Sequence, residues 1–209
     1  MHAKRISRLP LYRSRNYYGI CIWESIFAQR MAKRENQSLI INRILGLKRN
    51  GKYGDFFKTV IKAASDHFGA RSLAVIPGSK KGPSHLQILT GNRVFERTKE
   101  VRERRKYNHG EIPPEYGRSI KLNGHGLHGK ILLVDDIITT GATMDYFKGL
   151  LHRRKVITFA FAINWKLDPK PVGELLLPEA EHPTYSALEL IGMELEDIEL
   201  PDVDFSEYL

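Results

Sequence analysis

The segment 131–143 constrains the fold of this chain more than any other stretch. It reads Ile-Leu-Leu-Val-Asp-Asp-Ile-Ile-Thr-Thr-Gly-Ala-Thr, and its first four residues are apolar without polar alternation. Such a run is typical of a central parallel strand that is covered on both faces. Two carboxylates and a hydroxyl-rich turn follow, and apolar residues then recur at helical spacing at Met144, Phe147, Leu150 and Leu151. The segment therefore predicts a strand, a polar loop and a helix in direct succession.

Two more apolar runs extend this pattern. Residues 156–163 are rich in β-branched and aromatic side chains and predict a second strand, and residues 73–76 predict a short buried strand upstream. Strand, loop, helix and strand make a βαβ unit with parallel strands and a right-handed crossover. We therefore expect an α/β protein with an open, mainly parallel twisted sheet flanked by helices, in which ligands bind beyond the carboxyl ends of the strands.

The bulk composition excludes several classes of protein. With 209 residues, 42% of them hydrophobic and 27% charged, the chain is expected to form one principal domain. It contains no run of the ~18 to 20 apolar residues that a membrane helix needs, and its start lacks the apolar core of a signal peptide. We therefore expect a cytoplasmic protein with no membrane partner. Cys21 is the only cysteine, which excludes an intramolecular disulfide and a cysteine zinc site.

Charge is distributed unevenly along the chain. Lys170 is the last basic residue, and residues 171–209 contain 11 of the 24 acids, so this segment has a net charge of −11. The 33 basic and 13 acidic residues upstream leave that part of the chain at +20. Such an acidic segment either folds over the basic body or competes with anionic ligands for it, and a solvated tail is the alternative.

The basic residues near the N-terminus lie among tyrosines. Residues 1–19 have the mixture through which nucleic acid binds by phosphate contacts and stacking. A basic arm that packs on its own domain or is solvated is the alternative, and we favour it. From residue 20 to residue 31 the apolar residues Ile22, Trp23, Ile26 and Phe27 fit one face of a helix. These patterns predict a basic, helical N-terminal segment.

The loop after the central strand carries the chemistry expected of a phosphate site. Its glycine lets the backbone turn tightly, so amide N–H groups, threonine hydroxyls and a helix N-terminus can converge on a dianionic phosphate. The candidate phosphate-binding residues are Thr139, Thr140, Gly141, Ala142 and Thr143. Asp135 and Asp136 would repel that phosphate, but as ionised acceptors they suit the vicinal hydroxyls of a ribose or the shell of a divalent cation. The pattern predicts a sugar-phosphate site, and a capped helix with solvated carboxylates is the alternative.

The segment 131–143 resembles the 5-phosphoribosyl 1-pyrophosphate (PRPP) loop of the type I phosphoribosyltransferases and matches that family's pattern at every constrained position. The resemblance implies transfer of the 5-phosphoribosyl group from PRPP to a nitrogenous acceptor, expected to be a nucleobase, with release of pyrophosphate. It also implies that Asp135 and Asp136 hold the ribose hydroxyls as catalytic residues. Mg²⁺ would enter with the pyrophosphate and would have no direct protein ligand.

A second anion site is predicted after the strand at residues 73–76. The sequence Pro-Gly-Ser-Lys-Lys-Gly at residues 77–82 has two glycines that free the backbone and two lysines that add positive charge. The resemblance implies that this loop receives the pyrophosphate of PRPP. The candidate residues are Ser79, Lys80, Lys81 and Gly82. An ordinary polar connection with surface lysines is the alternative.

The segment 97–111 concentrates basic side chains before a His-Gly pair. The cations are Arg97, Lys99, Arg102, Arg104, Arg105 and Lys106. In the type I family a mobile loop in this part of the chain closes over PRPP, which implies a catalytic role for Arg105 and a pyrophosphate contact for Lys106. Residues 104–110 are similar to the loop of the orotate enzymes, although their Lys-to-Gly spacing is one residue longer. A charged helix in solvent is the alternative.

The order of these pieces over residues 40–165 is most similar to the ComF-like branch of the family. The cysteine zinc module and the Arg-Gly-Phe-Asn-Gln stretch of that branch are missing here. Thr139 stands where the hypoxanthine-guanine branch has a carboxylate, which argues against a 6-oxopurine salvage enzyme. Trp165 and Asp168 lie where several family members bind the base, and packing of the tryptophan at the rim of the core is the alternative.

We divide the chain into a basic helical segment at residues 1–45, a phosphoribosyltransferase core at 46–170 and an acidic segment at 171–209. The resemblance implies that the two terminal segments form a small variable hood over the core. Two alternative functions stay open, because fold does not settle function. One is a non-catalytic PRPP- or nucleotide-sensing regulator, and the other is a nucleic-acid-associated or defence-type effector. A homo-oligomer is compatible with each of them.

Overall fold

The computed structural model describes residues 8–23, 43–48, 51, 53–100, 114–124, 126–152 and 154–177. The strands are β1 (Arg8–Ser14), β2 (Tyr17–Gly19), β3 (Ile22–Trp23), β4 (Ser72–Val75), β5 (Phe95–Arg97), β6 (Ile120–Leu122), β7 (Ile131–Ile138), β8 (Val156–Asn164) and β9 (Lys170–Leu176). The helices are α3 (Gly54–Phe68), α4 (His85–Thr90), α5 (Pro114–Arg118), α6 (Ala142–Leu150) and the 3₁₀ helix η2 (Trp165–Leu167). Residues 43–48 are also helical.

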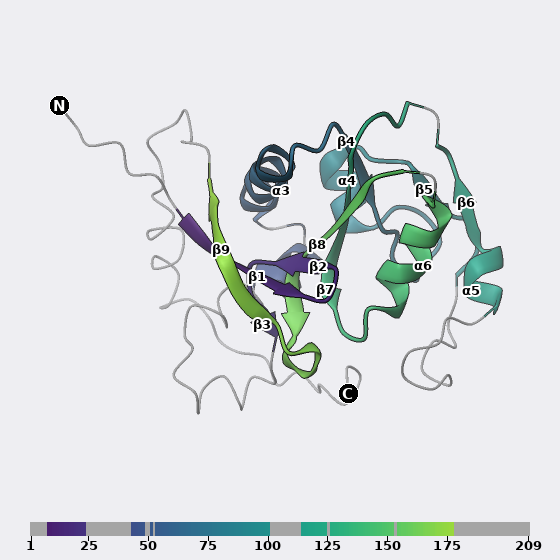
Figure 1. Cartoon of the computed structure of the whole chain (residues 1–209). Coiled ribbons are helices and arrows are strands. Elements are labelled where there is room, and N and C mark those ends of the chain that lie inside the picture. Colours follow the sequence, from purple (N-terminus) through teal and green to yellow (C-terminus); the bar gives the residue numbers. More distant parts are fainter. Residues whose placement is uncertain are drawn as a thin grey trace.

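A seven-stranded mixed sheet forms the centre of the molecule. Its order is β4-β7-β8-β2-β1-β9, and β3 also pairs with β8. The pairs β4–β7, β7–β8, β2–β8 and β3–β8 are parallel, whereas β1 is antiparallel to both β2 and β9. The predicted α/β class with a mainly parallel sheet flanked by helices is confirmed. Figure 1 shows β1 and β9 on one side of the molecule and the separate two-stranded antiparallel sheet β5–β6 on the other.

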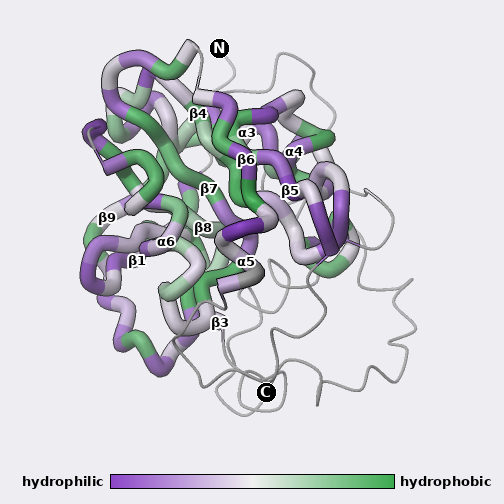
Figure 2. Tube along the Cα trace, turned by 90° about the vertical axis from the view of Figure 1, so that its right-hand side faces the viewer, coloured by the Kyte–Doolittle hydropathy of each residue, from purple (hydrophilic) through white to green (hydrophobic). Residues whose placement is uncertain are grey.

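The strand β7 is covered on both faces, as its apolar sequence predicts. All four residues from Ile131 to Val134 are fully buried. Leu132 and Val134 pack with residues of α3, whereas Ile131 and Leu133 pack with residues of α6. Figure 1 shows these two helices on opposite sides of β7 and β8, and Figure 2 shows the hydrophobic run of β7 inside the molecule. Each such side chain contributes about 1.5–3 kcal/mol of burial free energy, so this strand anchors the fold.

The predicted N-terminal helix is wrong for residues 8–23, which form three strands. In β1 the side chains alternate, with Leu9 and Leu11 buried and Arg8 and Pro10 exposed. This period of two fits a strand and not a helix. These three strands pair with strands near the other end of the described chain. The strand β1 pairs with β9, and β2 and β3 pair with β8.

The predicted boundary between core and acidic segment, after residue 170, falls inside β9. Residues 171–176 pair with β1 and belong to the sheet. The strands of residues 8–23 and 171–176 thus continue the main sheet instead of forming a hood over it. Residues 1–7, 24–42 and 178–209, which complete those segments, lie outside the described residues. Among the helices that are described, none is both long enough and apolar enough to cross a membrane.

Candidate functional site

The carboxyl ends of β4, β7 and β8 meet at one edge of the sheet because these strands are parallel. The strand β4 ends at Val75, which is paired with Val134, while β7 continues to Ile138. One further hydrogen bond of 2.9 Å runs from the Ile76 N–H to the Val134 carbonyl. The loop that follows β4 therefore begins beside Asp135 and Asp136. In open α/β sheets, ligands bind outside the carboxyl ends of the strands.

The two aspartates are half-buried and each one bonds to the next residue of the strand. The Asp136 N–H donates to Asp135 Oδ1 at 2.9 Å, and the Ile137 N–H donates to Asp136 Oδ1 at 2.7 Å. Successive side chains of a strand leave on opposite faces, so the two carboxylates have different surroundings. The predicted pair is therefore two distinct acceptors at the sheet edge.

Asp136 forms an ion pair that the sequence pattern did not indicate. Lys48 Nζ lies 2.7 Å from Asp136 Oδ2, and the two side chains are 38% and 26% exposed. Lys48 belongs to the helical residues 43–48, which are fixed in the core by Ile44 and Leu47. The ammonium offsets one of the two adjacent negative charges. No local signal in the sequence connects these positions.

The loop 139–141 opens α6 in the manner predicted. Gly141 is the N-cap of the helix and has φ 88° and ψ −16°, a left-handed conformation that favours glycine. Thr140 Oγ1 accepts from the Ala142 N–H at 3.4 Å, and the Asp145 N–H donates to the Gly141 carbonyl at 2.9 Å to close the first turn. The N–H groups of a first helical turn have no partner inside the helix, and they attract anions.

Tyr17 of β2 lies directly against this loop. A Cβ atom placed on Gly141 would be 2.3 Å from Tyr17 Oη and 2.7 Å from its Cζ. The side chain is 2% exposed, and its hydroxyl donates to Asp145 Oδ2 at 2.6 Å. Burial, and then the hydrogen bond to this carboxylate, raise the pKa of Tyr17 above its ordinary value of 10.0. Sequence reasoning missed this residue, because the Tyr17–Asp145 contact spans 128 positions.

The predicted pyrophosphate loop follows β4, and its polar side chains are exposed. They are Ser79, Lys80 and Lys81. Gly82 has φ 98°, and nothing lies within 4 Å of the position that a Cβ would take there. The loop ends at a capping box in which Ser84 Oγ accepts from the Gln87 N–H while Gln87 Oε1 accepts from the Ser84 N–H. A rigid helix start thus bounds a loop that presents two cations to solvent.

Arg97 has a different role from the one predicted. It was expected at the start of a mobile cationic loop, but it lies in β5 and is 3% exposed. Its Nε donates to the Gly78 carbonyl at 2.8 Å, its guanidinium donates to Ser119 Oγ, and it lies 4.0 Å from the ring centroid of Tyr116. The alternation of β5 turns Arg97 inward, where these acceptors hold it. Arg105 and Lys106 lie outside the described residues.

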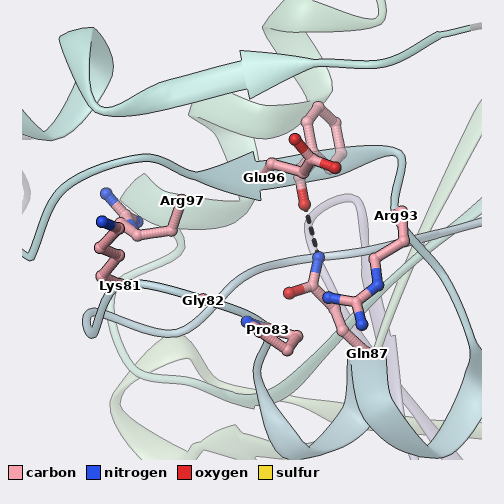
Figure 3. Close-up of a pocket in the computed structure, with 8 residues that line it drawn as sticks. Lys81, Gly82, Pro83, Gln87, Arg93, Glu96 and Arg97 are labelled. Atoms are coloured by element: carbon pink, nitrogen blue, oxygen red, sulfur yellow. Dashed lines mark hydrogen bonds between the residues drawn. The ribbon is translucent and has the colours of Figure 1, made fainter.

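A cavity of about 210 Å³ lies between this loop and β5 (Figure 3). Lys81 and Arg97 are together at one end and Arg93 is at the other. Gln87 lies between them and donates to the Phe95 carbonyl at 2.6 Å. Two residues of the predicted pyrophosphate loop, Lys81 and Gly82, therefore line the cavity. No residue of the loop 139–141 lines it.

The predicted base-binding residues follow β8 at the same edge of the sheet. Trp165 begins η2 and is 53% exposed. Asp168 has φ 50°, and its carboxylate lies 2.6 Å from Lys170 Nζ. The Asn164 side chain accepts from the Lys166 N–H at 2.9 Å and fixes the start of η2. This exposure does not fit a tryptophan packed inside the core, whereas packing at the rim of the core stays the alternative to base binding.

The fold and this edge define the class of the protein: an α/β protein with a mixed, mostly parallel sheet and polar loops at the carboxyl ends of its central strands. A scan against models of protein families finds no match to the chain, and a search of curated proteins finds none either. In the part of the chain that the structure describes, no group of three or more His, Cys, Asp or Glu side chains is placed to hold a metal ion.

Proposed function

We propose that the protein binds PRPP and transfers its 5-phosphoribosyl group to a nitrogenous acceptor, a nucleobase, with release of pyrophosphate. The fold would be that of a type I phosphoribosyltransferase. One observation carries the proposal: the acidic pair lies at the carboxyl end of a buried parallel strand, and a left-handed glycine then opens a helix directly after it. This arrangement offers acceptors for a sugar and N–H donors for a phosphate within one segment.

The loop after β7 would hold the 5-phosphate. The positive end of the α6 dipole and the N–H groups of its first turn favour a dianion at this position. The hydroxyls of the threonines add donors around it. The residues in this role are Thr139, Thr140, Gly141, Ala142 and Thr143.

The aspartates would hold the ribose. Ionised carboxylates are pure acceptors and suit the 2- and 3-hydroxyls of the sugar. Lys48 supports this role because it neutralises one charge at Asp136, which lowers the repulsion between two neighbouring carboxylates and a ligand that carries several phosphate charges. Asp136 Oδ1 and Oδ2 each have a partner already and keep further acceptor capacity for a hydroxyl.

The loop 77–82 would hold the pyrophosphate leaving group. Its exposed Ser79, Lys80 and Lys81 follow the strand that ends beside the aspartates. Gly82 leaves space for close approach of the backbone. Magnesium bound to the pyrophosphate would offset charge on the leaving group, and this hydroxyl and ammonium donor set fits a metal held by ligand oxygens and water. Arg105 and Lys106 are proposed to complete the closed state.

Catalysis on this site would be mainly positioning and stabilisation of the leaving group. Displacement at C1 of the ribose proceeds through an oxocarbenium-like transition state, so fixed sugar hydroxyls and a fixed phosphate hold C1 toward the acceptor. Trp165, exposed after β8, is proposed to stack on the base, and Asp168 to accept a hydrogen bond from it.

The proposal is tested by titrating the protein with PRPP and Mg²⁺ in a calorimeter and by measuring pyrophosphate release with a panel of bases. We expect binding in the micromolar range and a loss of about 100-fold or more in turnover for Asp135→Asn and Asp136→Asn. Glu174→Gln is the matched control, because Glu174 is an exposed carboxylate on β9 that pairs with Arg8.

Two outcomes separate the alternatives. Absence of any PRPP or ribose 5-phosphate binding contradicts the proposal. Binding without pyrophosphate release from any base supports a PRPP-sensing regulator on the same site, since that role needs the ligand and not the reaction.

A further inference from the structure

Tyr17 joins the N-terminal strands to the proposed phosphate loop. It lies on β2, whereas Gly141 and Asp145 lie at the start of α6. The following inference rests on the function proposed above. Tyr17 lies outside the segment 131–143.

The contact fixes the loop at two points. The tyrosine ring lies so close to Gly141 that a Cβ there would be 2.7 Å from Cζ and 2.8 Å from Cε2. The hydroxyl also donates to Asp145 Oδ2 at 2.6 Å, while the Asp145 N–H closes the first turn of α6 on the Gly141 carbonyl at 2.9 Å. One side chain thus touches both ends of the turn whose N–H groups would bind phosphate.

Tyr17 is itself held rigidly. It pairs with Thr158 of β8 on one side and with Ser14 of β1 on the other. The Thr158 hydroxyl also donates to the Asn16 carbonyl, which fixes the turn before β2. The tyrosine is 2% exposed and packs with the apolar residues on the α6 side of the sheet. The loop 139–141 therefore rests on a side chain that belongs to the sheet.

The hydrogen bond from Tyr17 also fixes the direction of the Asp145 carboxylate. Asp145 is an exposed acid in the first turn of α6, close in sequence to the residues proposed to bind a phosphate dianion. A carboxylate that turned toward this phosphate would repel it. The short hydrogen bond from Tyr17, a neutral donor to an ionised acceptor, holds the carboxylate against β2 instead.

We infer that Tyr17 is a positioning residue of the phosphate site: it sets the backbone path at Gly141 and keeps the Asp145 carboxylate turned away from the ligand. The N-terminal strands are then part of the site, and affinity for the phosphate end of the ligand depends on them. Tyr17 acts through the loop and does not touch the substrate.

The test compares Tyr17→Phe with Tyr18→Phe in the full chain. Tyr18 follows in the same strand and packs against Phe68, at 4.6 Å between ring centroids, on the α3 side of the sheet. Calorimetry with ribose 5-phosphate is expected to show about tenfold weaker binding for Tyr17→Phe, consistent with a lost hydrogen bond to a charged group. Tyr18→Phe is expected to stay within about twofold, because its hydroxyl has no part in this contact.

A double variant separates positioning from a general loss of structure. In Tyr17→Phe/Asp145→Asn the charge that the hydroxyl restrains is gone, so we expect affinity for ribose 5-phosphate to recover by at least half of the loss on a logarithmic scale. A Tyr17→Phe protein that binds as tightly as the wild type overturns the inference, and so does a double variant with no recovery.

Hydrogen exchange tests whether Tyr17 positions the loop without requiring that any ligand binds. We expect the amides of residues 139–145 to exchange faster in Tyr17→Phe than in the wild type, while those of β7 stay unchanged. If the wild type binds neither PRPP nor ribose 5-phosphate, the proposed function fails, and unchanged exchange at residues 139–145 would then overturn the positioning role as well. If Tyr17→Phe does not fold, Asp145→Ala removes the same hydrogen bond from the other side and takes its place in the exchange measurement.

Discussion

At the scale of single residues, Gly141 is subject to two independent constraints. Its φ of 88° favours glycine whatever surrounds it, and the Tyr17 ring occupies the volume that a Cβ would need. Gly126 offers a natural comparison, since its φ is 87° and nothing lies within 4 Å of the position of its Cβ. A comparison of substitutions at the two glycines therefore separates the cost of backbone strain from the cost of steric overlap.

We expect Gly141→Ala to lower the free energy of unfolding by more than about 2 kcal/mol, and Gly126→Ala by about 1 kcal/mol. Both carry the cost of a left-handed alanine, but only Gly141→Ala must also move a buried ring. Urea denaturation followed by circular dichroism measures both values. Equal losses in the two variants would show that the contact with Tyr17 carries no energy of its own.

At the scale of elements, the loop 77–82 and the two-stranded β5–β6 sheet form one unit around Arg97. The guanidinium reaches the loop at Gly78, α5 at the Tyr116 carbonyl and the residue after α5 at Ser119. The Gly82 N–H returns to the Arg97 carbonyl at 3.4 Å. The proposed pyrophosphate loop is thus supported by a buried arginine that does not need to contact the ligand.

Arg97→Met is expected to lower the free energy of unfolding by about 2–4 kcal/mol, because it leaves the part-buried Gly78 carbonyl and the buried Ser119 hydroxyl oxygen without the donor that Arg97 supplies. Arg93→Met is the control: Arg93 is exposed just before β5, and its replacement should change stability by less than about 0.5 kcal/mol. The midpoints of urea denaturation compare the stability of the two variants. Similar midpoints would rule out a structural role for Arg97.

The elements differ in how well their sequences predict them. The succession β7, α6 and β8 follows from apolar periodicity within some 30 neighbouring residues, so local patterns suffice. The strand β1 has the alternation of a strand, but it is short, and its partner β9 lies at the other end of the chain. For the same reason the pairs Lys48–Asp136 and Tyr17–Asp145 have no local signature. Local patterns in the sequence indicated the polar residues of the candidate site. Only the fold brings Lys48 and Tyr17 into contact with that segment and with the helix that follows it.

At the scale of the whole molecule, the sheet has a parallel part, in which β4, β7 and β8 present the site, and an antiparallel extension through β1 and β9. The strand β2 belongs to both parts, and Tyr17 on β2 carries a hydroxyl that is buried against a carboxylate. Ionisation of this hydroxyl would place two negative charges side by side, so its protonation is linked to folding of the entire domain.

The raised pKa of Tyr17 predicts a specific dependence of global stability on pH. The unfolded tyrosine loses its proton near its ordinary value of 10.0, whereas the folded one keeps it to higher pH, so its contribution is complete below pH 10 and declines above it. The stability advantage of the wild type over Tyr17→Phe should therefore shrink between pH 9.5 and 11. Thermal unfolding of both proteins across that range measures it, and a constant difference would contradict the linkage.

The pairing of β2 and β3 with β8 has a consequence for biosynthesis. The first strands of the domain leave the ribosome early, but the ladder that receives them is completed only when residues 156–164 have been made. Contacts of such large sequence separation form late and slow the search for the native state. A nascent chain that has already exposed residues 131–143 still lacks the support that Tyr17 gives them, so capture of the proposed phosphate ligand should begin only after the chain has grown past β8.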